Sequence, residues 1–136
     1  MFKMYLPDEA ATLALGARLA HVLVPGLSLY LRGDLGCGKT TLARGLLRGL
    51  GYTGRVKSPT YALVELYPIS RLDLYHFDFY RFNEAKEWRD AGFREYFNGA
   101  SVCLVEWPEK AAGLLPVADL DISFEFAGDG RDLSIR

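Results

Sequence analysis

The chain has 136 residues, half of them hydrophobic and 24% charged, which predicts one globular domain over residues 1–136. Sixteen Lys and Arg against seventeen Asp and Glu give a net charge of −1, which argues against a protein that binds nucleic acid through bulk charge. Two cysteines cannot build a disulfide scaffold, no apolar run reaches the roughly 18 residues of a membrane span, and no signal peptide is predicted, so we expect a cytoplasmic location.

The first half of the chain predicts two strands and two helices. Residues 2–5 form a short edge strand, and proline followed by two acids at 7–9 starts a helix whose leucines recur at helical spacing. Residues 27–31 are mostly apolar, as in a buried strand. A glycine-rich turn occupies 33–40, and the helix after it carries its leucines on one face and ends before Gly51.

The second half is richer in predicted strands. Its elements are strands at 62–67 and 72–79 joined by a turn at Pro68-Ile69-Ser70, a helix that Asn83 caps and that runs to about Ala91, a strand at 102–106, and strands at 120–126 and 133–135. Gly128-Asp129-Gly130 lies between the last two strands, which predicts a C-terminal β-hairpin. Strands and helices in this order predict a three-layer α/β fold.

The small net charge conceals an uneven distribution. Residues 1–64 carry eight basic and three acidic side chains, whereas residues 65–136 carry eight basic and fourteen acidic ones. No acid interrupts the run from Leu35 to Val64, which contains five bases. Chance clustering on a solvated face would explain this pattern, and so would a first half that binds an anion.

The eight residues from Gly33 to Thr40 satisfy the pattern G-x-x-x-x-G-K-[ST] of a phosphate-binding loop. Glycines let the backbone curl so that successive N–H groups point at phosphate oxygens, and the following helix adds the positive end of its dipole. Lys39 would place a mobile charge near the β- and γ-phosphates, and Thr40 would offer a hydroxyl to Mg²⁺. A plain glycine turn is the alternative, but the required strand before the loop and helix after it are both predicted.

A P-loop protein needs a second acidic group for the metal, usually at the end of a neighbouring apolar strand. Glu106 ends the apolar run 102–105 and fits that place, with Glu where Asp is more usual. A strand end that simply meets water is the alternative interpretation. We expect the metal role, because the phosphate-binding loop requires such a partner.

Two further segments combine polar side chains. His76, Asp78 and Tyr80 share one face of the predicted strand. A hydrogen-bonded core histidine beside an ordinary strand is the simpler interpretation of that face taken alone, but beside a P-loop Asp78 becomes a candidate for Mg²⁺ or for positioning water. The segment 58–61 predicts a rigid turn, and in a nucleotide-switching protein Thr60 on such a turn would sense the γ-phosphate and its metal.

Motifs that the chain lacks narrow the class of P-loop protein. It has no Asn-Lys-x-Asp or Thr-Lys-x-Asp sequence for reading guanine, which argues against a Ras-like GTPase. No obvious arginine-rich lid of a small-molecule kinase is visible, and the length leaves little room for an acceptor-substrate domain. A compact kinase for a nucleotide or small metabolite, and a non-catalytic nucleotide-binding adaptor, stay open as alternatives to an ATPase.

The combined motifs resemble the TsaE (YjeE) family, bacterial ATPases of tRNA threonylcarbamoyladenosine biosynthesis. The resemblance covers nearly the whole chain and begins with the early helix from Asp8 to Leu15 and the phosphate-binding loop through Thr41. Three later motifs carry the rest, namely Lys57-Ser58-Pro59-Thr60-Tyr61, His76-Phe77-Asp78-Phe79-Tyr80-Arg81 and Val105-Glu106-Trp107-Pro108-Glu109. The phosphate-binding loop is common to many families, but the ordered set in so short a chain is specific.

The resemblance implies a three-layer P-loop NTPase-like fold around a mainly parallel central sheet. It implies that the protein binds ATP or ADP with Mg²⁺ and hydrolyses ATP slowly. It also implies a supporting role beside the TsaB–TsaD complex, which transfers threonylcarbamoyl to the tRNA adenosine next to the anticodon. We expect contact with tRNA to be indirect or weak, because the chain is nearly neutral and lacks a basic stripe with stacking aromatics, and we expect no membrane contact.

The resemblance also implies roles for individual residues. Lys39, Asp78, Glu106 and Thr60 would be catalytic. The predicted metal-binding residues are Thr40, Glu106 and Asp78. The predicted nucleotide-binding residues are Gly33, Asp34, Leu35, Gly36, Cys37, Gly38, Lys39, Thr40 and Thr41, with Thr12 and Arg131 near the adenine and Trp107 as a functional aromatic beside the metal acid.

One position departs from the family pattern. Cys37 stands in the loop where the family often has Ala. A thiol fits there, because backbone N–H groups hold the phosphates. The helix N-terminus and Lys39 would favour a reactive thiolate at this position.

Overall fold

The computed structural model describes residues 1–69 and 72–136. The strands are β1 (Phe2–Leu6), β2 (Ser28–Arg32), β3 (Val64–Ile69), β4 (Leu72–Asp78), β5 (Val102–Glu106), β6 (Leu120–Ala127) and β7 (Gly130–Ile135). The helices are α1 (Glu9–Ala20), α2 (Lys39–Gly49) and α3 (Lys86–Asp90), with two 3₁₀ helices η1 (Phe93–Tyr96) and η2 (Pro108–Ala111). Within the described ranges, no helix is long and apolar enough to cross a membrane.

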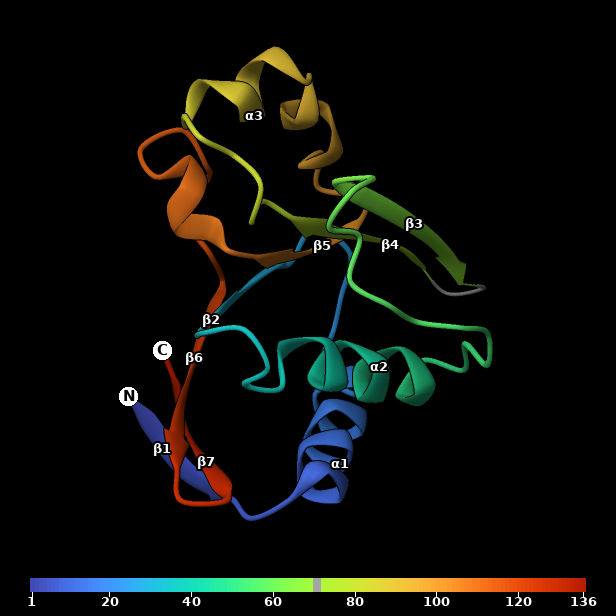
Figure 1. The fold of residues 1–136 in the computed structure, drawn as a ribbon. Coiled ribbons are helices and arrows are strands. Elements are labelled where there is room, and N and C mark those ends of the chain that lie inside the picture. Colours follow the sequence, from blue (N-terminus) through green and yellow to red (C-terminus); the bar gives the residue numbers. More distant parts are fainter. Residues whose placement is uncertain (70–71) are drawn as a thin grey trace.

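One seven-stranded sheet runs through the molecule in the order β1-β7-β6-β2-β5-β4-β3 (Figure 1). The four central strands, β6, β2, β5 and β4, are mutually parallel. The edges are antiparallel, because β3 pairs with β4 and the C-terminal hairpin β6–β7 continues into β1. The predicted parallel centre and C-terminal hairpin are therefore both present, within a mixed sheet.

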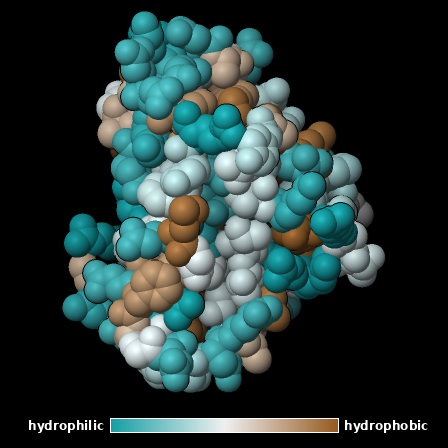
Figure 2. Space-filling model, in the orientation of Figure 1, coloured by the Kyte–Doolittle hydropathy of each residue, from teal (hydrophilic) through white to brown (hydrophobic). Residues whose placement is uncertain are grey.

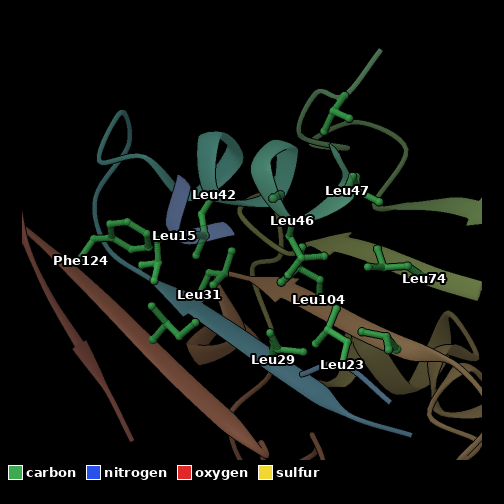
Figure 3. Packing of buried hydrophobic residues seen from close by; sticks show 14 of the residues in the cluster. Leu15, Leu23, Leu29, Leu31, Leu42, Leu46, Leu47, Leu74, Leu104 and Phe124 are labelled. Atoms are coloured by element: carbon green, nitrogen blue, oxygen red, sulfur yellow. The ribbon is translucent and has the colours of Figure 1, made fainter. Parts of the chain in front are cut away.

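Helices cover the sheet on both faces, which gives the predicted three layers (Figure 1). Leucines of α1 and α2 pack against alternate residues of the central strands, among them Leu29, Leu31 and Leu104 (Figure 3). The intervening strand residues face the other layer, where an aromatic cluster surrounds Phe77 and Trp88. This alternation follows from the two-residue period of a strand. The side of the molecule drawn in Figure 2 is mostly hydrophilic, with small scattered hydrophobic patches.

The phosphate-loop helix α2 is held against α1 by close backbone contact. A Cβ atom added at Gly45 would lie 2.3 Å from the backbone oxygen of Leu13, and one added at Gly16 would lie 2.5 Å from the oxygen of Leu42. Both distances are far below van der Waals contact, so these two positions exclude any larger residue unless the helices move apart. Glycine here lets the helices approach and thereby sets the height of α2 above the sheet.

Two predicted details differ from the structure. The predicted turn at 68–70 is partly wrong: Pro68 and Ile69 belong to β3, and Ser70 lies outside the described residues. An edge strand tolerates proline, because it need not donate a hydrogen bond outward. The predicted Asn83 cap is also wrong, since α3 begins at Lys86 and the Glu87 carboxylate accepts from the backbone N–H groups of residues 83 and 84.

Candidate functional site

The glycine-rich loop connects β2 to α2 at the carboxyl end of the parallel strands. Gly33, Gly36 and Gly38 adopt positive φ angles of 143°, 78° and 112°, which other residues rarely adopt. Gly38 stands at the N-cap of α2, and no side chain caps that end of the helix. The first N–H groups of α2 are therefore not satisfied by a cap, as in an anion-binding helix N-terminus.

Lys39 is only 4% exposed, although it carries a charge. Its ammonium group donates to the carbonyl of Gly33 and lies 3.8 Å from the centroid of the Trp107 ring. Trp107 itself has a positive φ of 59° and packs against Tyr80, with ring centroids 5.0 Å apart. A carbonyl dipole and an aromatic face thus hold the cation at the base of the loop.

Glu106 ends β5 as predicted and lies directly below the N-terminus of α2. It is 2% exposed. The Thr40 hydroxyl donates to its Oε2 over 3.4 Å, and His76 Nε2 lies 2.7 Å from the same oxygen. Strands β4 and β5 and helix α2 therefore bring an imidazole, a carboxylate and a hydroxyl together from positions up to 66 residues apart.

Asp78 ends the neighbouring strand β4 and pairs in register with Glu106. Its Oδ2 accepts from the hydroxyls of Ser58 and Thr60, the latter over 3.1 Å, and its Oδ1 accepts from the backbone N–H of Tyr80 over 2.8 Å. The predicted turn around Thr60 is thereby attached to the end of the sheet. Asp78 has three donors, so its carboxylate is held firmly at the cavity wall.

These groups line one cavity of about 290 Å³. Ten of the predicted site residues meet there, and they are Leu35, Gly36, Gly38, Lys39, Thr40, Thr41, Thr60, Asp78, Glu106 and Trp107. Ser58 and Tyr80 also line the cavity, and neither was a predicted site residue. Ser58 stands two residues before Thr60 in the same turn, and this spacing of hydroxyls is the signal that would have found it.

A second hollow of about 160 Å³ lies on the other side of the loop. It brings Thr12 of α1 and Arg131 of β7 beside Gly36 and Cys37. The Arg131 guanidinium donates to the carbonyls of Cys37 and Gly36 over 3.0 and 3.2 Å. The structure thus places Thr12 and Arg131 together against the glycine-rich loop, while their contact with adenine stays a prediction.

Cys37 does not have the electrostatic surroundings expected from the sequence. Its side chain is buried, and burial raises the pKa of the thiol, although Lys39 acts in the opposite direction. The expectation of an activated thiolate is therefore wrong, because loss of hydration outweighs the nearby charge. A Cβ added at Gly33 would meet the Cys37 sulfur at 2.6 Å, which shows how closely the thiol packs beneath the loop.

The donor set of the cavity fits a nucleotide with Mg²⁺. Carboxylate and hydroxyl oxygens are the ligands that Mg²⁺ takes, and it commonly uses one or two carboxylates together with phosphates. Asp78, Glu106 and Thr40 supply such oxygens at the end of the loop that suits phosphate. Among the described residues, no group of three or more His, Cys, Asp or Glu could hold a metal on its own.

Comparison with known proteins agrees with this arrangement. The model of the family described as threonylcarbamoyl adenosine biosynthesis protein TsaE matches residues 6–133. The tRNA threonylcarbamoyladenosine biosynthesis protein TsaE of Haemophilus influenzae is 46% identical, with 96% of this chain and 86% of the relative covered. That of Bacillus subtilis is 44% identical, with 90% and 75% covered.

The fold comparison leads to the same family. The crystal structure of Bacillus subtilis YdiB superposes with a TM-score of 0.84 at 36% identity, covering 98% of this chain and 83% of that one. The P-loop fold, the site at its centre and the match over residues 6–133 agree with one another. The chain belongs to the TsaE family of tRNA threonylcarbamoyladenosine biosynthesis.

Proposed function

We propose that this protein is an Mg²⁺-dependent ATPase that binds ATP and hydrolyses it slowly to ADP and phosphate, in support of the TsaB–TsaD complex. The observation that carries this proposal is the meeting of Lys39, Thr40 and Glu106 in one cavity at an uncapped helix N-terminus. We also propose a cytoplasmic location, which the role of the family in tRNA modification supports.

Each side chain has a task in the proposed reaction. The loop N–H groups and Lys39 bind the phosphates, which requires the Lys39 ammonium to leave the Gly33 carbonyl or share it. Thr40 and Glu106 would hold Mg²⁺, which would neutralise charge at the phosphates. Asp78 and Thr60 stand at the cavity wall, where they orient water or sense the γ-phosphate.

The nucleotide base occupies the second hollow in this proposal. Thr12 and Arg131 would then lie beside the adenine, on the opposite side of the loop from Glu106. The loop between the two hollows would bind the phosphates, so one nucleotide would span both. The existing bonds from Arg131 to the loop carbonyls would keep the hairpin β6–β7 close to the bound nucleotide.

The protein alone is expected to turn over slowly. No arginine is among the described residues that line the 290 Å³ cavity, and an arginine at the transferring phosphate accelerates P-loop hydrolysis by about 10³–10⁵-fold. A partner that completes the site would supply the missing stabilisation. This agrees with a chain that acts on the TsaB–TsaD complex, with tRNA contacted indirectly or weakly.

The test is reconstitution with TsaB, TsaD and tRNA, comparing ATP with a non-hydrolysable analogue. We expect sustained tRNA modification with ATP only, and phosphate release that the TsaB–TsaD pair stimulates. Lys39→Ala should abolish ATP binding, and Glu106→Ala should lose hydrolysis by at least about 100-fold together with its Mg²⁺ dependence. Arg18→Ala, which removes an exposed base from the same half of the chain and lines neither hollow, is the matched control.

Three results would contradict this proposal. Unchanged hydrolysis in both Lys39→Ala and Glu106→Ala would remove the cavity from the reaction. A labelled small-molecule product formed from ATP would favour a kinase. Full tRNA modification with the non-hydrolysable analogue would favour a non-catalytic nucleotide-binding adaptor.

A further inference from the structure

His76 is a buried polar side chain in a layer made mainly of leucines. It lies on β4, has no exposed surface, and faces the same side of the sheet as Leu74. Its register partner on β5 is Leu104, and Glu106 lies two residues further along that strand. Burial of an imidazole among apolar side chains costs free energy unless the ring is hydrogen-bonded, so the contact with Glu106 is what makes this position suitable for His.

The direction of the hydrogen bond follows from its surroundings. An ionised carboxylate only accepts, so the proton between His76 Nε2 and Glu106 Oε2 belongs to the imidazole. The other ring nitrogen, Nδ1, has no hydrogen-bond partner among residues 1–69 and 72–136. A buried N–H without a partner is rarer and more costly than a buried lone pair without one. The geometry therefore places a ring N–H on Nε2, directed at Glu106 Oε2.

This bond decides how Glu106 presents its carboxylate. Both donors, the Thr40 hydroxyl and His76 Nε2, use Oε2, and neither uses Oε1. Glu106 lines the cavity, and within the described residues neither of these hydrogen bonds occupies its Oε1. The hydrogen bond from His76 to Oε2 orients the carboxylate and leaves Oε1 for a cation.

We propose that His76 is a positioning residue: from β4 it fixes the side-chain rotamer of Glu106, so that this carboxylate can serve the nucleotide-bound cation. The inference rests on the proposed function, because it assumes that Glu106 meets Mg²⁺. Partners that hydrogen-bond to ligating groups commonly alter metal affinity or activity by about 10–100-fold when removed.

Three variants distinguish a loss of Glu106 positioning from a loss of protein stability. His76→Leu removes the donor and suits a leucine-rich layer. His76→Gln keeps an N–H that can reach Glu106 from the same strand. Leu104→Val removes a methylene beside His76 and leaves the Glu106 bond in place, so it reports what a small packing loss does by itself.

The measurement is the affinity for Mn²⁺ in the presence of a non-hydrolysable ATP analogue, read from the electron paramagnetic resonance of free Mn²⁺. We expect His76→Leu to bind Mn²⁺ at least about tenfold more weakly, and His76→Gln and Leu104→Val to stay within about threefold of the wild type. Wild-type affinity in His76→Leu would overturn the inference, and so would equal losses in all three variants. Absence of Mn²⁺ binding in the wild type would instead overturn the proposed function.

A second measurement needs neither metal nor nucleotide. The chain has only two histidines, and His21 is exposed at the end of α1, so ¹⁵N-histidine labelling gives two ring systems that are easily distinguished. We expect His76 to show a slowly exchanging N–H on Nε2, and His21 to exchange rapidly. Absence of an N–H on Nε2 of His76 would overturn the inference even if His76→Leu failed to fold.

Discussion

Asp78 and Glu106 are paired in register on neighbouring strands, yet different segments hold them. Glu106 accepts from Thr40, the second residue of α2, so it is attached to the element that presents the phosphate-binding loop. Asp78 accepts from Ser58 and Thr60, so it is attached to the segment between α2 and β3. The two carboxylates therefore link one cavity to two separate parts of the chain.

Both cysteines should be unreactive in the folded protein. Burial raises the pKa of the Cys37 thiol and raises that of Cys103 to about 12. A raised pKa leaves less thiolate at any pH below it, so reactivity should increase only as the pH rises toward these values. At pH 8 we expect iodoacetamide to alkylate each native thiol at least about tenfold more slowly than in the urea-unfolded chain. Mass spectrometry over time measures both rates, and equal rates at Cys37 would contradict its burial.

At the scale of elements, the packing of α1 against α2 positions the helix that follows the phosphate-binding loop. In Gly45→Ala, the added Cβ would lie 2.3 Å from the backbone oxygen of Leu13, which is a steric clash. Backbone cannot yield as a flexible side chain can, so we expect the free energy of unfolding to fall by about 1–3 kcal/mol. Urea denaturation measures this loss.

The matched control for that change is Arg44→Ala, one residue earlier on the same helix. Arg44 has a partly exposed side chain whose nearest acid, Glu9, is 3.9 Å away. Loss of such a surface pair changes stability by less than about 1 kcal/mol. Equal effects at positions 44 and 45 would show that the helices can move apart without cost.

Elements that the local sequence marks clearly lie where they were predicted, whereas the weakly marked helix near Asn83 does not. Residues 102–106 form β5 as predicted, and Gly51 follows α2 with a φ of 96°, as a C-terminal glycine should. The helix predicted at Asn83 is shorter, because no side chain caps its N-terminus and its first turn depends on Glu87 instead. Its tertiary anchor, the buried Trp88, is a property of the aromatic layer and not of the local sequence.

At the scale of the whole molecule, the strand order decides where the two hollows lie. The hairpin β6–β7 is last in sequence, but β6 pairs directly with β2. This crossover carries Arg131 to the glycine-rich loop, 94 residues away from Cys37 in sequence. The strands β4 and β5 extend the sheet in the other direction and bring Asp78 and Glu106 to the opposite side of the same loop.

The exposed basic residues also predict how strongly the isolated protein binds tRNA. Arg48 is exposed, but its guanidinium donates to the carbonyls of Tyr52 and Gly54, so we assign the phosphate contacts to the exposed Arg55 and Lys57. Two phosphate contacts predict weak binding that falls about tenfold between roughly 50 and 200 mM salt. Filter binding of tRNA to the isolated protein measures this slope, with the double variant Arg55→Ala and Lys57→Ala as control. Tight binding that persists at high salt would contradict it.

The sequence by itself determined the local chemistry: a phosphate-binding loop between a buried strand and a helix, and an acid that ends another buried strand. Such signals are readable because neighbouring residues carry them. Only the tertiary structure decided that His76 bonds to Glu106, that Ser58 and Thr60 bond to Asp78, and that Cys37 is buried, which raises the pKa of its thiol. These facts depend on strand register and on burial, which residues far apart in the chain create only when they pack together.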